Sequence, residues 1–370
     1  MQLTKKIAIG VYSDAAFSGV DVCVMTTDGI DVFDEPICIS RGYPEELREQ
    51  LASLRKEEDF VSTDLLKSLE EQITIHAIEA IKEIIALSKK IYPKIDIIGL
   101  SGQTVYHNPM HKVNITLMNA NLIADTFKCP VVNRFIQSDL AAGGKGGPLL
   151  ASFYEAITKE LEKPLVFVSL GGITAMTYIG GVGELMSFDV GPGNILLDTW
   201  VQKKYNQEMD YDGLLGAKGN VDTNLLKRLM KHPYLTQTPP KAADRNEFND
   251  LLDQVDGSSP ADGAATLTAF IADALVTAQH FLPSKPVLWI LSGGGSLNPT
   301  LVLKIKSALN PVRVETANEF GWDKNALSSQ GYAFLAVRSL FGLPISFPST
   351  TGVSEPVCGG HIHYPDEGEK

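Results

Sequence analysis

Asp189 is the residue whose surroundings point most directly to chemistry. It closes the apolar segment "SFDV" and stands just before a Gly-Pro-Gly turn. A carboxylate at the end of a strand can act as a general base toward a bound water. It can also cap a helix, and a helix is expected from Asn194 to Lys203, although the intervening turn places Asp189 early for a cap. The residues alone leave both interpretations open.

Three glycine-rich turns follow apolar segments and could hold phosphate groups. They read "VYSDAAFSG", "SLGGIT" and "SGGGSLNP". Glycine lets backbone amides approach a ligand closely, and amides at strand ends and helix starts bind anions. Taken alone, each turn is more typical of a plain tight turn. The stretch "GGKGGP" contains Lys145 but lacks the Lys-Ser or Lys-Thr ending of a Walker loop.

Other polar residues give weaker signals. Lys241 and Arg245 lie in "KAADRNEF", which is expected to be a solvated charged loop, with contact to an anion as the alternative. His107 follows a strand and is expected to be a surface or hydrogen-bonding residue. The cysteine and two histidines of "CGGHIHY" have poor spacing for zinc and lack a fourth ligand, so no metal site is expected.

The composition is that of a globular, acidic protein. The 370 residues are 44% hydrophobic and 21% charged, with a net charge of −12. The acidic balance argues against nonspecific binding to nucleic acid or membranes. No apolar run is expected to reach the roughly 18 residues of a membrane span, and no signal peptide is apparent. Four cysteines that are far apart in sequence favour reduced thiols, so a cytoplasmic location is expected.

The pattern of apolar residues predicts two related α/β lobes. The first begins with a strand, a turn and a second strand in "KIAIGVYSDAAFSGVDVCVMTTDG", and a helix is predicted from Thr63 to Ser88. The same start returns in "PLVFVSLGGITAMTYIG", and "ELMSFDV" adds a strand. The polar segment 205–259 predicts an insertion with short helices. Two similar halves suggest a cleft between the lobes.

Several motifs, taken in order along nearly the whole chain, resemble those of the anhydro-N-acetylmuramic acid kinase family. "SDLAAGGKGGPLL" resembles the family's RDxAAGGQGAPL, and "SFDVGPGNILLDTW" resembles FDTGPGNxLxDxW. "SGGGSLNP" resembles CGGGxxNP, "KAADRNEF" resembles KSxxRxxF, and "YAFLAVRSLFGLPISFPSTTGV" resembles the closing AFAxLAxRxLxGxPxxxPxxTG. Together these motifs are specific for the family and less specific for activity.

The resemblance implies a two-lobed actin/hexokinase-like fold, a duplicated RNase H-like α/β fold with a central cleft. We place the first lobe at residues 1–134 plus 349–370 and the second at 135–348. Members phosphorylate 1,6-anhydro-N-acetylmuramic acid with ATP and Mg²⁺ during cell-wall recycling in the bacterial cytoplasm, and a homodimer is expected. In them an aspartate activates the water that opens the 1,6-bridge at C1, and the freed O6 takes the γ-phosphate. By position that aspartate is Asp189, and nearby helix amides are expected to keep it ionised.

The resemblance also assigns binding residues. Those expected to contact the nucleotide are Gly10, Ser13, Ser18, Gly19, Asp21, Gly171, Gly172, Gly293, Gly294 and Gly295. Those expected to contact the sugar are Gln103, Asp139, Gly191, Gly193 and Asn194.

The turn after the first strand departs from the family pattern MSGTSLDGVD. Asp14 replaces a glycine, Ala15 and Ala16 replace Thr and Ser, and Ser18 replaces the acid. If Asp14 faced the phosphates, two unit charges ~4 Å apart would repel by about 4 kcal/mol at an effective dielectric of 20. That energy corresponds to roughly three orders of magnitude in ATP affinity.

Further departures affect other ligand-facing loops. Ser101 replaces the histidine of SHGQT, Arg134 and Ile136 change DFRxxD, and Ser328 replaces the glutamate of MEAxAF.

Two functional hypotheses follow from the motifs and their departures. The first is an active, divergent anhydro-sugar kinase that uses ATP. The second is a noncatalytic pseudokinase relative that serves as a sensor, a binder or a partner subunit.

Overall fold

The computed structural model describes residues 3–14, 16–54, 62–108, 111–181, 183–323 and 326–366. The chain forms two compact units. Unit 1 comprises Met1–Lys159, Ala326–Pro348 and Gly352–Lys370, and unit 2 comprises Glu160–Asn325 and Ser349–Thr351. Ala15 of the first turn lies outside the described residues.

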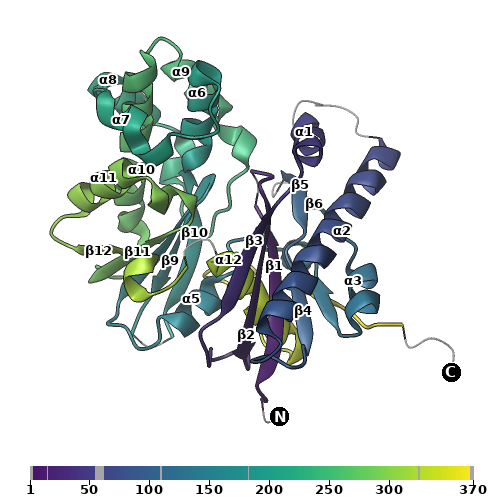
Figure 1. The fold of residues 1–370 in the computed structure, drawn as a ribbon. Helices are drawn as coiled ribbons and strands as arrows, with labels where there is room; N and C mark the ends of the chain where they lie inside the picture. The colour runs from purple at the N-terminus through teal and green to yellow at the C-terminus, as the bar shows by residue number, and fades with distance from the viewer. Residues whose placement is uncertain are drawn as a thin grey trace. The chain divides into compact units, whose positions relative to one another are not determined.

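Unit 1 is a mixed six-stranded sheet with helices on both faces, drawn from purple to teal with a yellow end in Figure 1. Its elements in chain order are β1 (Lys6–Ser13), β2 (Gly19–Thr27), β3 (Ile37–Gly42), α1 (Glu45–Ser53), α2 (Thr63–Ser88), β4 (Ile97–Leu100), β5 (Gln103–Asn108), β6 (Val113–Leu117), α3 (Ala120–Phe127), β7 (Val131–Asn133), α4 (Phe135–Ala141), α5 (Ala151–Ile157), α12 (Leu327–Leu340) and β13 (His361–His363).

Unit 2 is built on a five-stranded sheet. Its elements are β8 (Leu165–Leu170), β9 (Ile173–Ile179), β10 (Leu185–Pro192), α6 (Asn194–Tyr205), η1 (Tyr211–Gly213), α7 (Leu214–Lys218), α8 (Thr223–Leu229), η2 (Pro233–Thr236), η3 (Arg245–Phe248), α9 (Asn249–Val255), α10 (Pro260–Ala278), η4 (Gln279–Phe281), β11 (Leu288–Ser292), η5 (Gly294–Leu297), α11 (Pro299–Leu309), β12 (Arg313–Thr316) and η6 (Ala317–Phe320).

The two sheets share one topology. The strand order is β13-β7-β4-β1-β2-β3 in unit 1 and β10-β9-β8-β11-β12 in unit 2. In both, the first strand pairs antiparallel with the second, the second pairs antiparallel with the third, and the fourth and fifth continue in parallel from the first. This repetition confirms the predicted duplication of one α/β lobe. It also explains why similar hairpin sequences open both halves.

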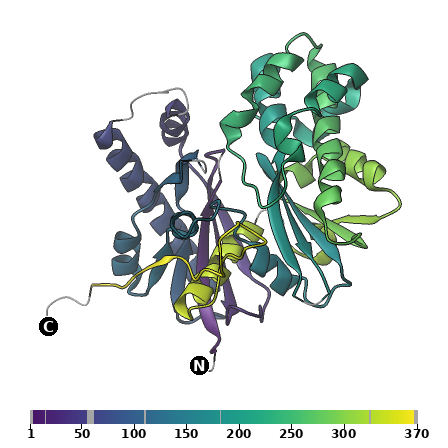
Figure 2. The ribbon, with the colours of Figure 1, turned by 180° about the vertical axis from the view of Figure 1, so that it is seen from behind.

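Helices α2 and α12 cover opposite faces of the unit 1 sheet. Ile9 and Val11 of β1 join the apolar cluster that contains Ile73 and Ile81 of α2. Gly10, between them on the strand, faces α12, because residues alternate across a strand. Figure 2 shows α12, in yellow-green, against the face of this sheet that is turned away from α2. The helix predicted over Thr63–Ser88 has the same bounds as α2, and the Ser62 side chain caps it.

The division of the chain differs from the expected lobe boundaries. Residues 135–159 and 326–348 belong to unit 1 rather than to the second half. The reason is α12, which packs on β1, β2 and β4 and also contacts α5. The chain therefore returns to unit 1 before the C-terminal tail begins. The 205–259 segment contains only short helices, from η1 to α9.

Helix α10 corrects the expectation about apolar segments. Residues Pro260–Phe281 are long and apolar enough to cross a membrane by length and composition, with a mean hydropathy of 1.2. However, 72% of the window is buried inside the protein, as is typical of a core helix. A search for apolar runs overlooks this helix, because aspartates and threonines interrupt its apolar residues.

Gly10 gives a test of the packing between β1 and α12. A Cβ at this position would collide with the carbonyl oxygen of Ser329, a backbone atom that cannot turn away. We expect Gly10→Ala to lower the free energy of unfolding by about 1–3 kcal/mol, the usual cost of overpacking. Thermal unfolding should show a lower Tm. The matched control is Gly42→Ala on β3, where the nearest atom would be Ser18 O at an ordinary 3.7 Å; an equal loss in both variants would contradict this account.

Candidate functional site

The turn after β1 is closed by the side chain of Asp14. One carboxylate oxygen accepts hydrogen bonds from the backbone amides of Ala16 and Ser18, both at 3.1 Å. The other accepts from the Ser18 hydroxyl at 2.7 Å. The carboxylate thus occupies donors that a phosphate-binding turn would present to its ligand. Repulsion of ATP requires Asp14 to face the ligand, whereas the structure shows its carboxylate folded back onto its own turn.

Gln103 and Ser101 hold this turn in place through hydrogen bonds to its backbone. The buried Gln103 amide donates to the Asp14 carbonyl oxygen at 2.7 Å, and its own Oε1 is buried without a hydrogen-bond partner. The backbone amide of Ser13 donates to the Ser101 hydroxyl at 3.0 Å, and the Ser13 hydroxyl lies 3.2 Å from that of Tyr43. Gln103, expected to contact a sugar, is therefore a support of the β1 turn in this structure.

Three other residues expected at the nucleotide lie in packing positions. Gly10 faces α12, and a Cβ on Gly19 would collide with the backbone carbonyl of Arg41 on β3. Asp21 accepts a hydrogen bond from the Ser40 hydroxyl across the β2–β3 pair. In the described structure their contacts fix the sheet beside the turn. Of the first-lobe residues, Ser13 and Ser18 are the ones that lie in the turn itself.

Asp139 organises the glycine-rich loop that precedes α5. The residue is fully buried, and its carboxylate accepts from the Gly146 amide at 2.7 Å. A Cβ on Gly144 would collide with the same carboxylate. Asp139 was expected to contact the sugar, and its visible role is to hold the loop around Lys145 in shape.

In unit 2 two of the predicted glycine-rich turns, after β8 and after β11, lie against the Gly-Pro-Gly turn at the start of α6. The Gly193 amide donates to Gly172 O at 2.8 Å, and the Asn194 amide donates to Gly171 O at 2.9 Å. The Asn194 side chain donates to Leu170 O at 3.0 Å. The structure therefore brings the β8–β9 turn against the β10–α6 turn.

The triple glycine after β11 completes this group. Gly293 has φ +78° and lies against the Leu170 backbone, so a side chain there would be strained and crowded. A Cβ on Gly295 would come within 2.7 Å of the Asn194 side-chain oxygen. These contacts require glycine, and they leave a surface of backbone atoms where the three turns meet. The predicted grouping of Gly171, Gly172, Gly293, Gly294 and Gly295 thus exists in the fold.

Asp189 lies on β10, at the edge of the unit 2 sheet, where the strand irregularity between Asp189 and Gly191 begins. Its backbone amide donates to Lys241 O at 3.0 Å, and its carboxylate accepts from the Ala243 amide at 2.9 Å. Helix α6 is capped by Gly193 without any side-chain bond. The alternative that Asp189 caps this helix is therefore wrong.

The environment of Asp189 sets its proton affinity. Burial raises the pKa of Asp189 to about 7, although the Ala243 amide and the Lys241 charge act in the opposite direction. The expectation that helix amides keep this carboxylate ionised is wrong, because the first α6 amides bond to the β8–β9 turn instead. A carboxyl with a pKa near 7 can exchange protons with water at neutral pH.

Sequence reasoning missed the residues that enclose Asp189. Lys241, expected in a solvated loop, is only 4% exposed. The Tyr234 hydroxyl donates to Asp189 O at 3.2 Å. The "KAADRNEF" motif, which resembles a family motif, could have indicated that Lys241 lies near Asp189. Its charged residues predicted a solvent-exposed loop instead. The Arg245 side chain lies outside the described structure.

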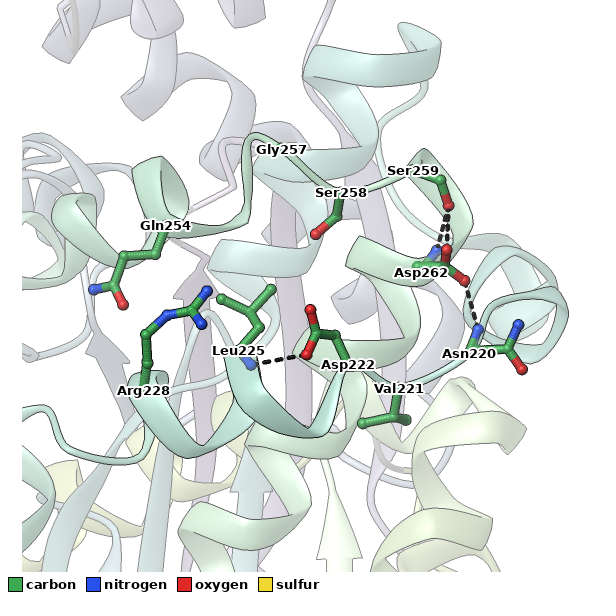
Figure 3. A pocket seen from close by; sticks show the side chains of 10 residues that line it. All are labelled: Asn220, Val221, Asp222, Leu225, Arg228, Gln254, Gly257, Ser258, Ser259 and Asp262. Carbon is green, nitrogen blue, oxygen red and sulfur yellow. Dashed lines mark hydrogen bonds between the residues drawn. The ribbon is translucent and has the colours of Figure 1, made fainter.

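A separate pocket of about 510 Å³ lies among the short helices of the 205–259 segment and the start of α10 (Figure 3). The side chains of Asp222 and Arg228 on α8 point into it. It contains none of the predicted site residues, and Asp222 and Asp262 use their carboxylates to cap α8 and to bond the Asn220 amide. Its polar groups therefore serve the local fold.

The described residues include no group of three or more His, Cys, Asp or Glu side chains that could hold a metal ion. His363 contacts the side-chain oxygens of Asn121 and Asn133, and its ring lies against that of His361. His107 pairs with the Asn114 side chain on β6 at 3.1 Å. These histidines take part in local hydrogen bonding within unit 1.

Two units whose sheets repeat one strand arrangement, with glycine turns at strand ends, define the duplicated α/β fold of the actin and hexokinase type. Residues 6–365 match the family described as anhydro-N-acetylmuramic acid kinase. The chain belongs to this family.

Curated relatives with the same family name match 97% of the chain. An anhydro-N-acetylmuramic acid kinase from Rhodopseudomonas palustris (strain HaA2) is 38% identical over 365 residues, covering 97% of this chain and 99% of that protein. One from Paramagnetospirillum magneticum is 35% identical over 360 residues, covering 97% and 100%. Among solved structures, (R)-2-hydroxyglutaryl-CoA dehydratase component A from Acidaminococcus fermentans is a distant match. Its TM-score is 0.45 and its identity 12%, over 90% of this chain and 98% of that one.

Proposed function

We propose that this chain is an ATP-dependent kinase that opens the 1,6-anhydro bridge of anhydro-N-acetylmuramic acid with water and phosphorylates the freed O6. The observation that carries the proposal is Asp189, placed in the family's strand motif and held with a pKa near 7. Full-length relatives that bear the kinase name favour this activity over the noncatalytic alternative.

The proposed step balances around C1 and O6 of the sugar. The Asp189 carboxylate accepts a proton from water as the water oxygen bonds to C1. The C1–O6 bond breaks, and O6 bonds to the γ-phosphorus while ADP leaves. The products are N-acetylmuramic acid 6-phosphate, ADP and a proton, which Asp189 releases to solvent.

The two glycine turns after β8 and β11 fit a nucleotide. Gly171, Gly172, Gly293 and Gly294 are at least partly exposed and carry no side chains, and such backbone can approach phosphates or an adenosine closely. Mg²⁺ bound with ATP would neutralise the phosphate charge. In unit 1, the Ser18 amide and hydroxyl would contact phosphate only if Asp14 released them. A homodimer and a cytoplasmic location remain expectations of the family resemblance.

The activity can be tested with purified protein, ATP–Mg²⁺ and anhydro-N-acetylmuramic acid. We expect one ADP and one N-acetylmuramic acid 6-phosphate per turnover, identified by mass spectrometry. Calorimetry with ATP–Mg²⁺ should show binding at or below millimolar concentration. A folded sample without detectable nucleotide binding would instead support the noncatalytic relative.

The pKa of Asp189 predicts how the reaction depends on pH. The base form is populated above about pH 7, so kcat/KM should fall about tenfold per pH unit below that value. A pH series at saturating ATP, with the sugar varied, measures the midpoint. A midpoint near 4, that of a solvated aspartate, would contradict the raised pKa of Asp189.

A further inference from the structure

Lys241 is a buried ammonium in the loop between η2 and η3. Its Nζ donates to the Tyr234 carbonyl at 2.8 Å and lies 3.5 Å from the Leu235 carbonyl. None of the ion pairs in the described part of the chain includes this lysine. A buried charge without a paired carboxylate is costly, so its retention calls for a physical reason.

Aromatic rings support the charge. Nζ lies 4.5 Å from the centre of the Tyr234 ring, 5.3 Å from that of Phe281 and 5.9 Å from that of Phe188. The negative faces of such rings stabilise an ammonium. Burial lowers the pKa of Lys241 to about 8, while Asp189 and Glu247 act in the opposite direction. The side chain is therefore mostly protonated at neutral pH.

The same loop holds Asp189. The Lys241 carbonyl accepts from the Asp189 amide, the Ala243 amide donates to the Asp189 carboxylate, and the Tyr234 hydroxyl donates to the Asp189 carbonyl. One segment therefore supplies both the Ala243 amide, which donates to the Asp189 carboxylate, and the Lys241 ammonium, whose charge acts on that carboxylate. The other titratable groups around this segment are Glu247, His232 and Asp244. Glu247 acts on Lys241, and His232 and Asp244 act on Glu247.

We propose that Lys241 is a positioning residue for Asp189: its buried ammonium, anchored on the Tyr234 carbonyl, favours the ionised carboxylate, and its backbone carbonyl bonds the Asp189 amide in the segment whose Ala243 amide donates to that carboxylate. The catalytic consequence rests on the proposed function. The aromatic rings and the Tyr234 carbonyl keep the charge in place.

The test compares Lys241→Met with Lys241→Arg. In Lys241→Met the midpoint of the acid limb of kcat/KM should rise by about one pH unit. Activity at pH 7 should then fall about fivefold and recover near pH 9, and Lys241→Arg should restore the original midpoint. The control is Lys204→Met, which removes an ammonium 4.5 Å from the Trp200 ring but on α6. If Lys241→Met does not fold, Lys241→Gln, which keeps a donor for the Tyr234 carbonyl, replaces it.

A second readout is independent of turnover. NMR titration of ¹³C-labelled aspartate carboxyls, with Asp189→Asn used to assign the signal, measures the pKa of Asp189 directly. We expect the same upward shift in the neutral Lys241 variant. An unshifted Asp189 would overturn the proposal even if the enzyme is active, whereas a shift in an inactive protein would refute the proposed function alone.

A different observation concerns the cysteines. Cys23 on β2 and Cys38 on the edge strand β3 are direct partners in the antiparallel register. Their sulfur atoms lie 3.0 Å apart. Directly opposite residues have Cα atoms about 4.5–5.5 Å apart, within the range that a disulfide spans. Cys38 is partly exposed, while Cys23 is buried.

We infer that this thiol pair is a site of reversible oxidation by peroxide. The Cys38 thiolate attacks one peroxide oxygen, giving a sulfenic acid and one water. The Cys23 thiolate then attacks that sulfur, forming the disulfide and releasing the second water. Two thiols and one hydrogen peroxide thus give one disulfide and two waters.

Peptide mass spectrometry after treatment with hydrogen peroxide tests this inference. We expect a Cys23–Cys38 crosslinked peptide that dithiothreitol removes. Cys38→Ser should abolish it, and Cys129→Ser should leave it unchanged. Cys38 sulfinic acid as the main product without a crosslink, or no reaction of either thiol at millimolar peroxide, would overturn it.

Discussion

Asp189→Asn should lower kcat by about three orders of magnitude, which is the scale of a lost general base. Asparagine keeps the size of the side chain and can still accept the Ala243 amide at the same place. It cannot take a proton from water. The measurement is single-turnover formation of N-acetylmuramic acid 6-phosphate, with ATP binding followed separately.

The stability of the same variant distinguishes lost chemistry from lost structure. Because the folded pKa of Asp189 is raised to about 7, its protonated form stabilises the fold below the unfolded pKa. This contribution is lost as the pH rises through about 7. Asp189→Asn should therefore be more stable than the parent protein at pH 8. Asp273→Asn is the control, since burial also raises the pKa of this α10 carboxyl; equal loss of activity in both would contradict a base role for Asp189.

Asp14→Gly should increase the affinity for ATP–Mg²⁺ by about 10- to 100-fold. The substitution frees the Ala16 and Ser18 amides and the Ser18 hydroxyl, which now bond to the Asp14 carboxylate. It also removes a negative charge from the turn. Hydrogen bonds to a charged group contribute about 1.5–3 kcal/mol, and 1.4 kcal/mol corresponds to a factor of ten. Isothermal calorimetry measures the change.

Asp28→Asn provides a matched control for the Asp14 variant. Asp28 closes the turn at the other end of β2, accepting from the Ile30 amide at 2.9 Å and from the Asp31 amide at 2.8 Å. Its replacement should leave the Kd for ATP unchanged. If Asp14→Gly bound ATP with unaltered or lower affinity, the hydrogen bonds of Asp14 within its turn would not be what weakens ATP binding.

The sequence predicted features that depend on periodicity and on local motifs. The apolar spacing of α2 is regular, and the Ser62 cap defines its start, so its predicted bounds agree with the structure. The repeated hairpin sequences predicted the duplicated topology. The sequence predicted each glycine turn of unit 2 singly, and the family resemblance assigned them to one nucleotide. The strands that precede the two turns, β8 and β11, are adjacent in one sheet.

The remaining features depend on contacts between distant segments. Lys241 is buried because aromatic rings from three separate elements surround it, and a local charge pattern does not contain that information. The direction of the Asp14 side chain depends on which amides of its own turn are available. Helix α12 returns to unit 1 because Gly10 and Gly99 allow its backbone to lie close to β1 and β4.

The most direct test of the central claim is the reaction in water labelled with ¹⁸O. Water should add at C1, and the original bridge oxygen should receive the phosphate. The product is therefore expected to carry one ¹⁸O at C1 and none in its phosphate, and one ADP should form per sugar. The label should enter C1 faster than it enters unlabelled product incubated in the same water. Release of ¹⁸O-labelled inorganic phosphate without any phosphorylated sugar would contradict the account.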